Sequence, residues 1–222
     1  MKAIAVDIDG TITDKNRKIC VNAINALRKA EDAGYPIILV TGNVLCTAKM
    51  VSIMLGTSGG IVCENGGVVN TIKRNLVLGD IEKCRPAYEF LKSRHDVEKT
   101  EFSDIRLSEI AIKREIDVDI VKETVKNFDV EVYDTKFAIH ITDPLVNKGK
   151  SLKIVAEDMG ITTDEILAIG DSENDLEFLE VAGFKVAVSN ADQELKENTD
   201  YITKKSYGDG AAEAIEKFIL TK

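Results

Sequence analysis

Near its start the chain runs Ala3-Ile4-Ala5-Val6-Asp7-Ile8-Asp9-Gly10-Thr11. The segment from Lys2 to Asp7 is a short apolar run of the kind that is buried on both faces of a parallel sheet. Asp9 and Gly10 are typical of the turn that follows such a strand. We therefore predict an interior β-strand that carries two carboxylates, those of Asp7 and Asp9, at its carboxyl end.

Strands and helices alternate on both sides of the middle of the chain. Before the middle, the pattern predicts a helix that ends at Gly34, a strand over 36–40, a helix over about 44–55 and a strand over 60–63. After it, the pattern predicts a helix that ends at Gly160, a strand over 165–169, a helix over about 174–183, a strand over 184–188 and a final helix. This alternation predicts an α/β fold built on a doubly wound parallel sheet.

Between about residues 80 and 145 the pattern changes. It predicts a helix over 81–94, a strand-like segment over 105–112, a helix near 118–128, and two further strands over 130–133 and 137–141. This order is typical of a small α+β domain. No internal repeat or low-complexity linker separates it from its surroundings, so we predict an insertion, 80–145, into a discontinuous core made of 1–79 and 146–222.

The composition excludes several classes of protein. Hydrophobic residues make up 44% of the 222 and charged residues 30%, which fits a globular protein with a substantial core. The longest apolar run, Ile37–Val40, is far shorter than the roughly 20 residues of a membrane helix. We expect no membrane association, no leader segment and a cytoplasmic location.

The charge balance and the cysteines indicate which binding partners and metal sites to expect. With 29 basic against 38 acidic residues, the net charge of −9 argues against nucleic-acid binding but leaves room for a small anionic substrate in a local site. The four cysteines, Cys20, Cys46, Cys63 and Cys84, have no metal-binding spacing. We expect them to be buried thiols.

Three polar clusters follow predicted core strands. They are Asp7-Ile8-Asp9-Gly10-Thr11, Thr41-Gly42-Asn43 and Gly170-Asp171-Ser172-Glu173-Asn174-Asp175. Each alone resembles an ordinary turn, but the carboxyl ends of strands in a doubly wound sheet are where ligands bind. Several aspartates at one crevice would repel one another unless a cation neutralised them, and all-oxygen ligands favour Mg²⁺. Lys148, just before a core helix, offers a permanent positive charge there.

These clusters resemble a known family. Asp7-Ile8-Asp9-Gly10-Thr11 matches the D-x-D-G-T/V signature of the haloacid-dehalogenase-like (HAD) phosphatases. Thr41, Lys148 and Gly170-Asp171-x-x-Asn174-Asp175 are similar to the second, third and fourth motifs of that superfamily, in the same order. The resemblance covers 1–79 and 146–222 and implies a HAD-like, Rossmannoid core. The place of the insertion resembles the Cof-like branch, which carries an α+β cap. The short chain, the small cap and Thr41-Gly42-Asn43 are most similar to the archaeal phosphoglycolate phosphatase group.

The resemblance implies an activity and a role for each motif residue. The activity is Mg²⁺-dependent hydrolysis of a small phosphate monoester, 2-phosphoglycolate in the group that the chain resembles most, through an aspartyl phosphate on Asp7. Asp9 would act as general acid and then as general base. The Mg²⁺ ligands would be Asp7, the main-chain carbonyl of Asp9, Asp171 and Asp175. The groups that bind the phosphate or substrate would be Thr41, the Gly42 amide, Lys148 and Asn174.

The predicted cap and one loop carry weaker candidates. Residues that could hold a carboxylate of the substrate are Arg106, Lys113, Arg114 and His140, although each also fits an ordinary surface or strand position. The segment Glu64-Asn65-Gly66-Gly67 resembles a loop near the site in Cof-like enzymes. It equally fits a glycine turn that leads into a hairpin.

Other functions remain open at this stage. A sugar-phosphate phosphatase or a phosphomutase would share all four motifs, and only the cap separates them. A phosphate-accepting signalling receiver also uses aspartates, a threonine, a lysine and Mg²⁺, but lacks an acid two residues after the acceptor and has no cap. A non-catalytic binding protein is disfavoured because every catalytic position is filled. The expected partner is a small phosphorylated metabolite, and a homodimer would fit the resemblance.

Overall fold

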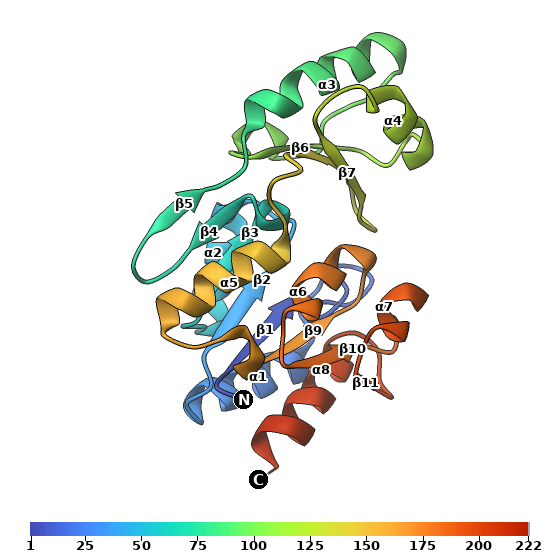
Figure 1. Cartoon of the computed structure of the whole chain (residues 1–222). Helices are drawn as coiled ribbons and strands as arrows, with labels where there is room; N and C mark the ends of the chain where they lie inside the picture. The colour runs from blue at the N-terminus through green and yellow to red at the C-terminus, as the bar shows by residue number, and fades with distance from the viewer. Residues whose placement is uncertain (222) are drawn as a thin grey trace.

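A mixed eight-stranded sheet runs through the larger body of the molecule. The computed structural model, which describes residues 1–221, orders its strands β11-β10-β9-β1-β2-β3-β4-β5 (Figure 1). The strands are β1 (Ala3–Asp7), β2 (Ile37–Val40), β3 (Gly60–Cys63), β4 (Val68–Asn70), β5 (Asn75–Val77), β9 (Ile166–Gly170), β10 (Phe184–Ala187) and β11 (Tyr201–Ile202). From β11 to β3 all neighbours pair in parallel, which confirms the predicted fold class. The β3–β4 and β4–β5 pairs are antiparallel, so the glycine segment after β3 does turn into a hairpin.

Helices cover both faces of this sheet. They are α1 (Val21–Asp32), α2 (Leu45–Leu55), α5 (Lys148–Met159), α6 (Leu176–Glu180), α7 (Gln193–Glu197) and α8 (Tyr207–Ile215). α1 packs against α2 and α8, whereas α5 packs against α6, β3 and β4. Short 3-10 helices cover Glu64–Gly66, Ser103–Ile105, Thr163–Glu165 and Glu173–Asp175, and a π-helical turn covers Glu216–Leu220.

β1 lies at the centre of the sheet, and all five of its residues are buried. Its neighbours are β2 on one side and β9 on the other, with Ile4 opposite Ile37 and Leu167. Apolar side chains on both faces of the strand join one continuous core. This burial on both faces explains why the strand shows an unbroken apolar run instead of an alternating pattern.

The segment between β5 and α5 forms a second, smaller body, the cap. It contains the three-stranded antiparallel sheet β6-β8-β7, made of β6 (Glu109–Ile112), β8 (Ile139–Thr142) and β7 (Glu131–Asp134). Helices α3 (Ile81–Arg94) and α4 (Val118–Val125) pack against it around an apolar cluster that is separate from the main core. The cap stacks above the edge of the main sheet in Figure 1.

One prediction about the cap is wrong in its extent. The strand expected over 105–112 begins only at Glu109, because Ser103–Ile105 forms a 3-10 turn. Ile105 and Leu107, which suggested a strand, are 53% and 47% exposed. They do not belong to the apolar face of the cap sheet.

Asp143 joins the two chain segments that connect the cap to the core. Its Oδ2 accepts a hydrogen bond from the Asp80 amide at 3.1 Å, and its Oδ1 accepts one from Lys83 Nζ at 2.9 Å. Asp143 is 2% exposed, so burial alone would raise the pKa of its carboxyl, yet the Lys83 contact and the amide bonds hold that pKa below its usual range. The ionised carboxylate therefore fixes both connections at one point.

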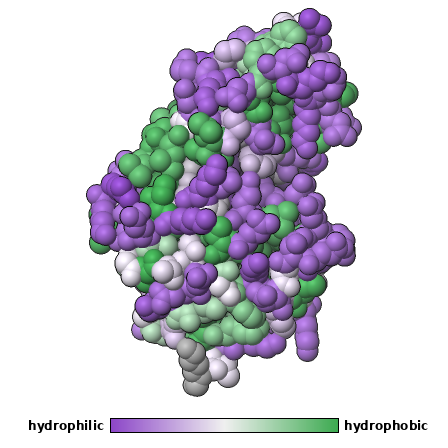
Figure 2. Space-filling view, viewed as in Figure 1, coloured by the Kyte–Doolittle hydropathy of each residue, from purple (hydrophilic) through white to green (hydrophobic). Residues whose placement is uncertain are grey.

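The surface in view is mostly hydrophilic, and only two of the four cysteines are buried. Figure 2 shows mostly hydrophilic side chains on the face in view, with scattered hydrophobic ones. No helix of the described chain is long and apolar enough to cross a membrane. All four cysteines are free; Cys63 and Cys84 are buried as expected, but Cys46 is exposed and Cys20 is intermediate.

Candidate active site

Three of the predicted aspartates meet beneath the cap. Asp7 ends β1, whereas Asp171 and Asp175 follow β9, the strand beside it. One carboxylate oxygen from each lies within 4.8 Å of the others, and the three residues are at most 5% exposed. The adjacency of β1 and β9 in the parallel sheet brings together residues that lie far apart in the sequence.

Two glycines make room for this cluster. Gly10 has φ +92°, and a Cβ added there would lie 2.4 Å from Oδ2 of Asp171. A Cβ at Gly170 would lie 2.8 Å from the side chain of Asp175. No other residue type fits at either position without displacing a carboxylate of the cluster.

The carboxylates of the cluster repel one another when they are ionised. Burial, and then the neighbouring Asp175, raise the pKa of Asp171 to about 6, and the same two causes raise the pKa of Asp7 well above its usual range. The raised pKa values mean that burial and mutual repulsion disfavour the ionised forms of these carboxylates. A hard divalent cation, which prefers oxygen ligands, would relieve that repulsion. The residues present therefore fit Mg²⁺.

Lys148 is a buried basic residue of the cluster. It is the first residue of α5, whose N-cap Asn147 accepts a hydrogen bond from the Lys150 amide at 2.8 Å. Its Nζ lies 2.5 Å from Oδ1 of Asp175 and 3.3 Å from Oδ1 of Asp7. Burial opposes its charge, but the two carboxylates raise the pKa of Lys148 above its usual value. Lys148 therefore neutralises part of the negative charge of the three carboxylates.

Asp9 is not one of the three clustered carboxylates and has its own partners. Its Oδ1 accepts a hydrogen bond from Arg17 Nε at 2.8 Å, and its Oδ2 accepts one from Asn43 Nδ2 at 2.5 Å. Arg17 also lies over the ring of Phe137 in the cap, 5.0 Å from its centroid. Asp9 is therefore positioned by groups from the core, and one of those groups touches the cap.

Thr41 and Gly42 form a turn at the end of β2, the other neighbour of β1. The Thr41 hydroxyl accepts hydrogen bonds from the amide and the side chain of Asn43, each at 3.1 Å, which leaves its own proton free to donate. The Gly42 carbonyl accepts a hydrogen bond from Nη1 of Arg106 in the cap at 2.9 Å. This turn thus contacts both the core and the cap.

The side chain of Asn174, one of the predicted phosphate- or substrate-binding residues, bonds to Asn65 and Ser172. Its Nδ2 donates to Oδ1 of Asn65 at 3.1 Å, and its Oδ1 accepts from the Ser172 hydroxyl at 2.5 Å. Asn65 and Glu64 both have positive φ, 51° and 48°, which is unusual for residues with side chains. The segment after β3 is therefore part of the site.

Glu64 and Asn65 also join the core to the cap. Oε2 of Glu64 accepts hydrogen bonds from the amides of Leu107 and Ser108, each at 2.9 Å. Asn65 Nδ2 donates to Oε2 of Glu109, the first residue of β6, at 2.9 Å. The strained backbone at this point presents two successive side chains to the cap.

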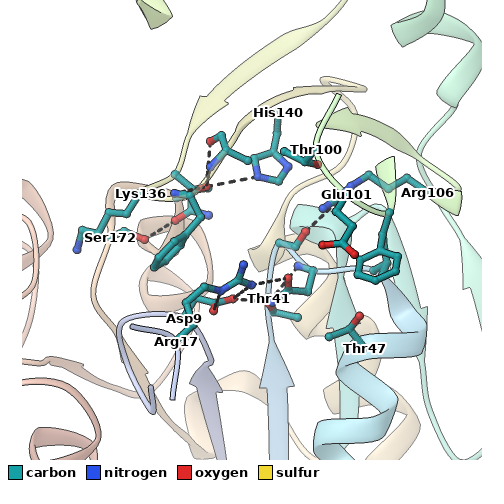
Figure 3. A pocket seen from close by; sticks show the side chains of 18 of the residues that line it. Asp9, Arg17, Thr41, Thr47, Thr100, Glu101, Arg106, Lys136, His140 and Ser172 are labelled. Atoms are coloured by element: carbon teal, nitrogen blue, oxygen red, sulfur yellow. Dashed lines mark hydrogen bonds and ion pairs between the residues drawn. The ribbon is translucent and has the colours of Figure 1, made fainter. Parts of the chain in front are cut away.

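A cavity of about 360 Å³ lies between the core and the cap. Figure 3 shows Asp9, Arg17 and Thr41 on one side of it and His140 and Arg106 on the other. The predicted site residues that line it are Asp7, Asp9, Thr41, Gly42 and Asn174. Lys148, Asp171 and Asp175 are buried next to Asp7.

Three of the four cap candidates line this cavity, and one does not. Arg106, Lys113 and His140 belong to its wall. Arg114 instead contacts Asp134, with Nε 2.8 Å from Oδ1, and lines a separate groove. We therefore exclude Arg114 as a residue of this cavity.

Sequence reasoning missed two basic residues of the cavity wall. Arg17 lies in the polar turn after β1 and resembles a solvated residue in the sequence. Lys136 lies in the β7–β8 turn, and its Nζ is 2.6 Å from Oδ2 of Asp171. Arg17 reaches Asp9 and Asn43 within the core, but nothing in the sequence of the turn marks these contacts. Lys136 has no local sequence signal, because it reaches Asp171 only when the cap packs on the core.

The fold and the site together define a class of hydrolase. The chain belongs to the haloacid dehalogenase-like hydrolases, and the match to that family covers residues 4–98 and 80–215. It is 58% identical over 219 residues to a phosphoglycolate phosphatase of Methanothermobacter thermautotrophicus, with 99% of each chain covered. It is 45% identical to a phosphoglycolate phosphatase of Methanobrevibacter smithii, with 98% of each covered. A solved structure of a Thermoplasma acidophilum protein, 26% identical, superposes with a TM-score of 0.92 over 100% of this chain and 99% of that one.

Proposed function

We propose that this hydrolase is a Mg²⁺-dependent phosphatase that converts 2-phosphoglycolate to glycolate and phosphate. The observation that carries the reaction class is the meeting of Asp7, Asp171, Asp175 and Lys148 beside the cavity between the core and the cap. The substrate is supported by the names of relatives that are 58% and 45% identical over nearly their whole length. The volume of about 360 Å³ is near the lower end of the range for ligand pockets, about 300–1,000 Å³, and suits a small metabolite.

In the first step, an oxygen of Asp7 attacks the phosphorus atom and the bond to the leaving oxygen breaks. The product of this step is an aspartyl phosphate on Asp7. A carboxylate needs no base to activate it, which agrees with a chain whose two histidines both lie in the cap. Asp7, Asp171, Asp175 and the Asp9 carbonyl would hold Mg²⁺, which would supply the positive charge that lets two anions approach.

Asp9 acts as general acid in the first step and as general base in the second. It lines the cavity, as Asp7 does, and lies two residues further along the chain. In the first step it donates a proton to the leaving glycolate oxygen. In the second step it accepts a proton from the water that attacks phosphorus, which releases phosphate and regenerates Asp7. Arg17 and Asn43 hold its carboxylate in place for both.

The remaining polar groups stabilise the transferring oxygens. The Thr41 hydroxyl has a free proton to donate, and the Gly42 amide lies at the cavity wall beside it. Lys148 forms an ion pair with Asp7 and offsets the negative charge that develops during phosphoryl transfer. The predicted homodimer and cytoplasmic location are not needed for this mechanism and stay predictions.

The experiment that tests this function measures Mg²⁺-dependent phosphate release from a panel of phosphorylated metabolites. The panel contains 2-phosphoglycolate, sugar phosphates, nucleotides and glycerate phosphates. We expect the highest kcat/KM with 2-phosphoglycolate, no release in EDTA, and none with Asp7→Asn. Asp32→Asn, at the exposed end of α1, is the matched control and should behave as the parent protein.

Other outcomes would reassign the protein. Highest activity on sugar phosphates would keep the mechanism and reject the proposed substrate. Transfer of the phosphoryl group between two positions of one sugar would indicate a phosphomutase. A stable aspartyl phosphate without turnover would indicate a receiver.

A further inference from the structure

Arg106 of the cap has a guanidinium edge without a partner. Its Nη1 donates to the Gly42 carbonyl at 2.9 Å and also contacts Oε1 of Glu109. Its Nε is buried and has no hydrogen-bond partner among the described residues, and no hydrogen bond of the described chain involves its Nη2. A buried donor without an acceptor is costly, so an acceptor is expected there.

Other arginines of this chain show what that edge binds. Arg17 uses Nε and Nη2 to contact the two carboxylate oxygens of Asp9, at 2.8 and 3.3 Å. Arg74 uses the same two atoms on Asp158, at 3.0 and 2.9 Å. The Nε–Nη2 edge is a fork that matches a carboxylate. In Arg106 the fork is formed, but no protein carboxylate occupies it.

Glu109 holds Arg106 and His140 together at the cavity wall. Its carboxylate is 0% exposed and accepts from His140 Nδ1 at 2.8 Å as well as from Arg106. Burial alone would raise the pKa of Glu109, but His140 and Arg106 hold that pKa below its usual range, so the group is ionised. Because Nδ1 of His140 is bound to Glu109, Nε2 is the ring nitrogen left for another partner, and its described contact is the Thr135 hydroxyl at 3.4 Å. Nε2 donates to a carboxylate when both ring nitrogens carry a proton.

The other basic residues of the cavity each have a carboxylate of their own. Arg17 binds Asp9, Lys136 binds Asp171, and Lys113 binds Glu98. Arg106 and His140 instead share the single carboxylate of Glu109. Among the described basic residues of the wall, this pair therefore has the least carboxylate bound per side chain and can accept an anion.

We propose that Arg106 and His140 form a subsite for a carboxylate on the leaving group of the substrate. The proposal rests on the phosphatase function above and makes it more specific. Arg106 contacts the Gly42 carbonyl, so the subsite adjoins the turn that would hold the phosphate. In a two-carbon phosphorylated acid the carboxylate likewise lies close to the phosphate, so one such molecule would place its two groups in these two adjoining positions. Glu109 is a positioning residue that orients both side chains.

The test compares 2-phosphoglycolate with ethyl phosphate, in which a methyl group replaces the carboxylate. The measured quantity is the ratio of kcat/KM for the two substrates, taken on one preparation so that inactive molecules cancel. We expect the parent protein to prefer 2-phosphoglycolate. Arg106→Lys keeps the charge but removes the fork, and should lower the ratio about 10- to 100-fold by slowing only the carboxylate substrate. His140→Gln should lower the ratio in the same direction.

Arg85→Lys is the control, because Arg85 lies on α3 and pairs with Glu82 away from the cavity. It should leave the ratio unchanged. An unchanged ratio in Arg106→Lys, or an equal loss of activity on both substrates, would overturn the subsite. If circular dichroism shows that Arg106→Lys is unfolded, the ratio in His140→Gln decides by the same criterion. A parent protein that does not discriminate between the two substrates would reject the proposed substrate itself, which is a separate outcome.

Discussion

Lys136 of the cap places its Nζ 2.6 Å from Oδ2 of Asp171, a carboxylate of the core. The lysine lines the cavity, whereas Asp171 is 0% exposed beneath it. The other carboxylate oxygen of Asp171 accepts from the Thr11 hydroxyl at 3.0 Å. The cap thus contributes a positive charge to the cluster that would hold Mg²⁺, and the lysine competes with the metal for one ligand atom.

Replacing Lys136 by Met should therefore strengthen Mg²⁺ binding. One hydrogen bond to a charged group is worth about 1.5–3 kcal/mol, so we expect the Kd for Mg²⁺ to fall by roughly tenfold or more. Isothermal titration calorimetry measures this directly. Lys92→Met, at an exposed position on α3, is the control. An unchanged Kd would mean that Lys136 does not oppose the metal.

Gly10→Ala should disrupt the cation site because of a clash. The added Cβ would lie 2.4 Å from Asp171 Oδ2, in a backbone conformation with φ +92°. We expect weaker Mg²⁺ binding and at least a tenfold loss of kcat. Gly34→Ala shares the positive φ, 86°, but its Cβ meets nothing within 4 Å. That control should lose only about 1 kcal/mol of stability and keep full activity. Equal activity in both variants would contradict the steric argument.

Lys148→Met should destabilise the fold as well as abolish activity. Removing the lysine leaves Asp7 and Asp175 buried without their partner, which typically costs about 3–5 kcal/mol. Urea unfolding in EDTA measures the change in the free energy of unfolding. The loss should be smaller when Asp175→Asn is combined with Lys148→Met. Lys150→Met, an exposed residue on the same helix, should have little effect. A loss of the same size with and without Asp175→Asn would argue against the ion pair.

Asp171 should make the metal-free protein less stable as the pH rises. The folded protein raises the pKa of Asp171 from 3.8 to about 6, so it binds this proton more tightly than the unfolded chain does. Its contribution to stability is fully present below about pH 4 and is lost as the pH rises through about 6. Urea unfolding in EDTA between these values measures the slope. The slope should be smaller in Asp171→Asn and should disappear with saturating Mg²⁺, which favours the ionised carboxylate. Identical slopes for the parent protein and Asp171→Asn would contradict the assignment.

Arg17→Gln should slow only the hydrolysis of substrates whose leaving group must be protonated by a general acid. Arg17 positions Asp9, the proposed proton donor, and its side chain is 49% exposed, so stability should change little. An alkyl leaving group requires protonation, whereas p-nitrophenolate does not. We expect kcat to fall about 10- to 100-fold with 2-phosphoglycolate and little with p-nitrophenyl phosphate. Equal losses on both would show that Arg17 acts on the phosphate and not through Asp9.

Much of the fold and of the acidic site could be predicted from the sequence, for a physical reason. Asp7, Thr41 and Asp171 directly follow buried strands, and the carboxyl ends of parallel strands share one edge. Local patterns therefore place them in space once the sheet is recognised. The helix predicted over 81–94 from its apolar positions is found at Ile81–Arg94, and the structure shows that the side chain of Asp80 caps it.

The rest depends on how the cap packs on the core, which no local pattern encodes. Glu109 resembles an ordinary polar strand residue, yet it is 0% exposed because Arg106, His140 and Asn65 all turn toward it. Lys136 resembles a solvated turn residue, yet it contacts Asp171 across the two bodies. These relations are tertiary, and they involve the residues that we expect to select the substrate.

The position of β1 has a consequence for biosynthesis. One edge of this strand pairs with β2 soon after both leave the ribosome, but the other edge waits for β9, about 160 residues later. Until then an apolar strand has an open edge, which invites aggregation and delays completion of the core. The cap, which is continuous in sequence and has its own apolar cluster, can fold in the meantime. A ribosome stalled before residue 166 would therefore carry Asp7 without Asp171 and Asp175, and the acidic cluster would be complete only near the end of translation.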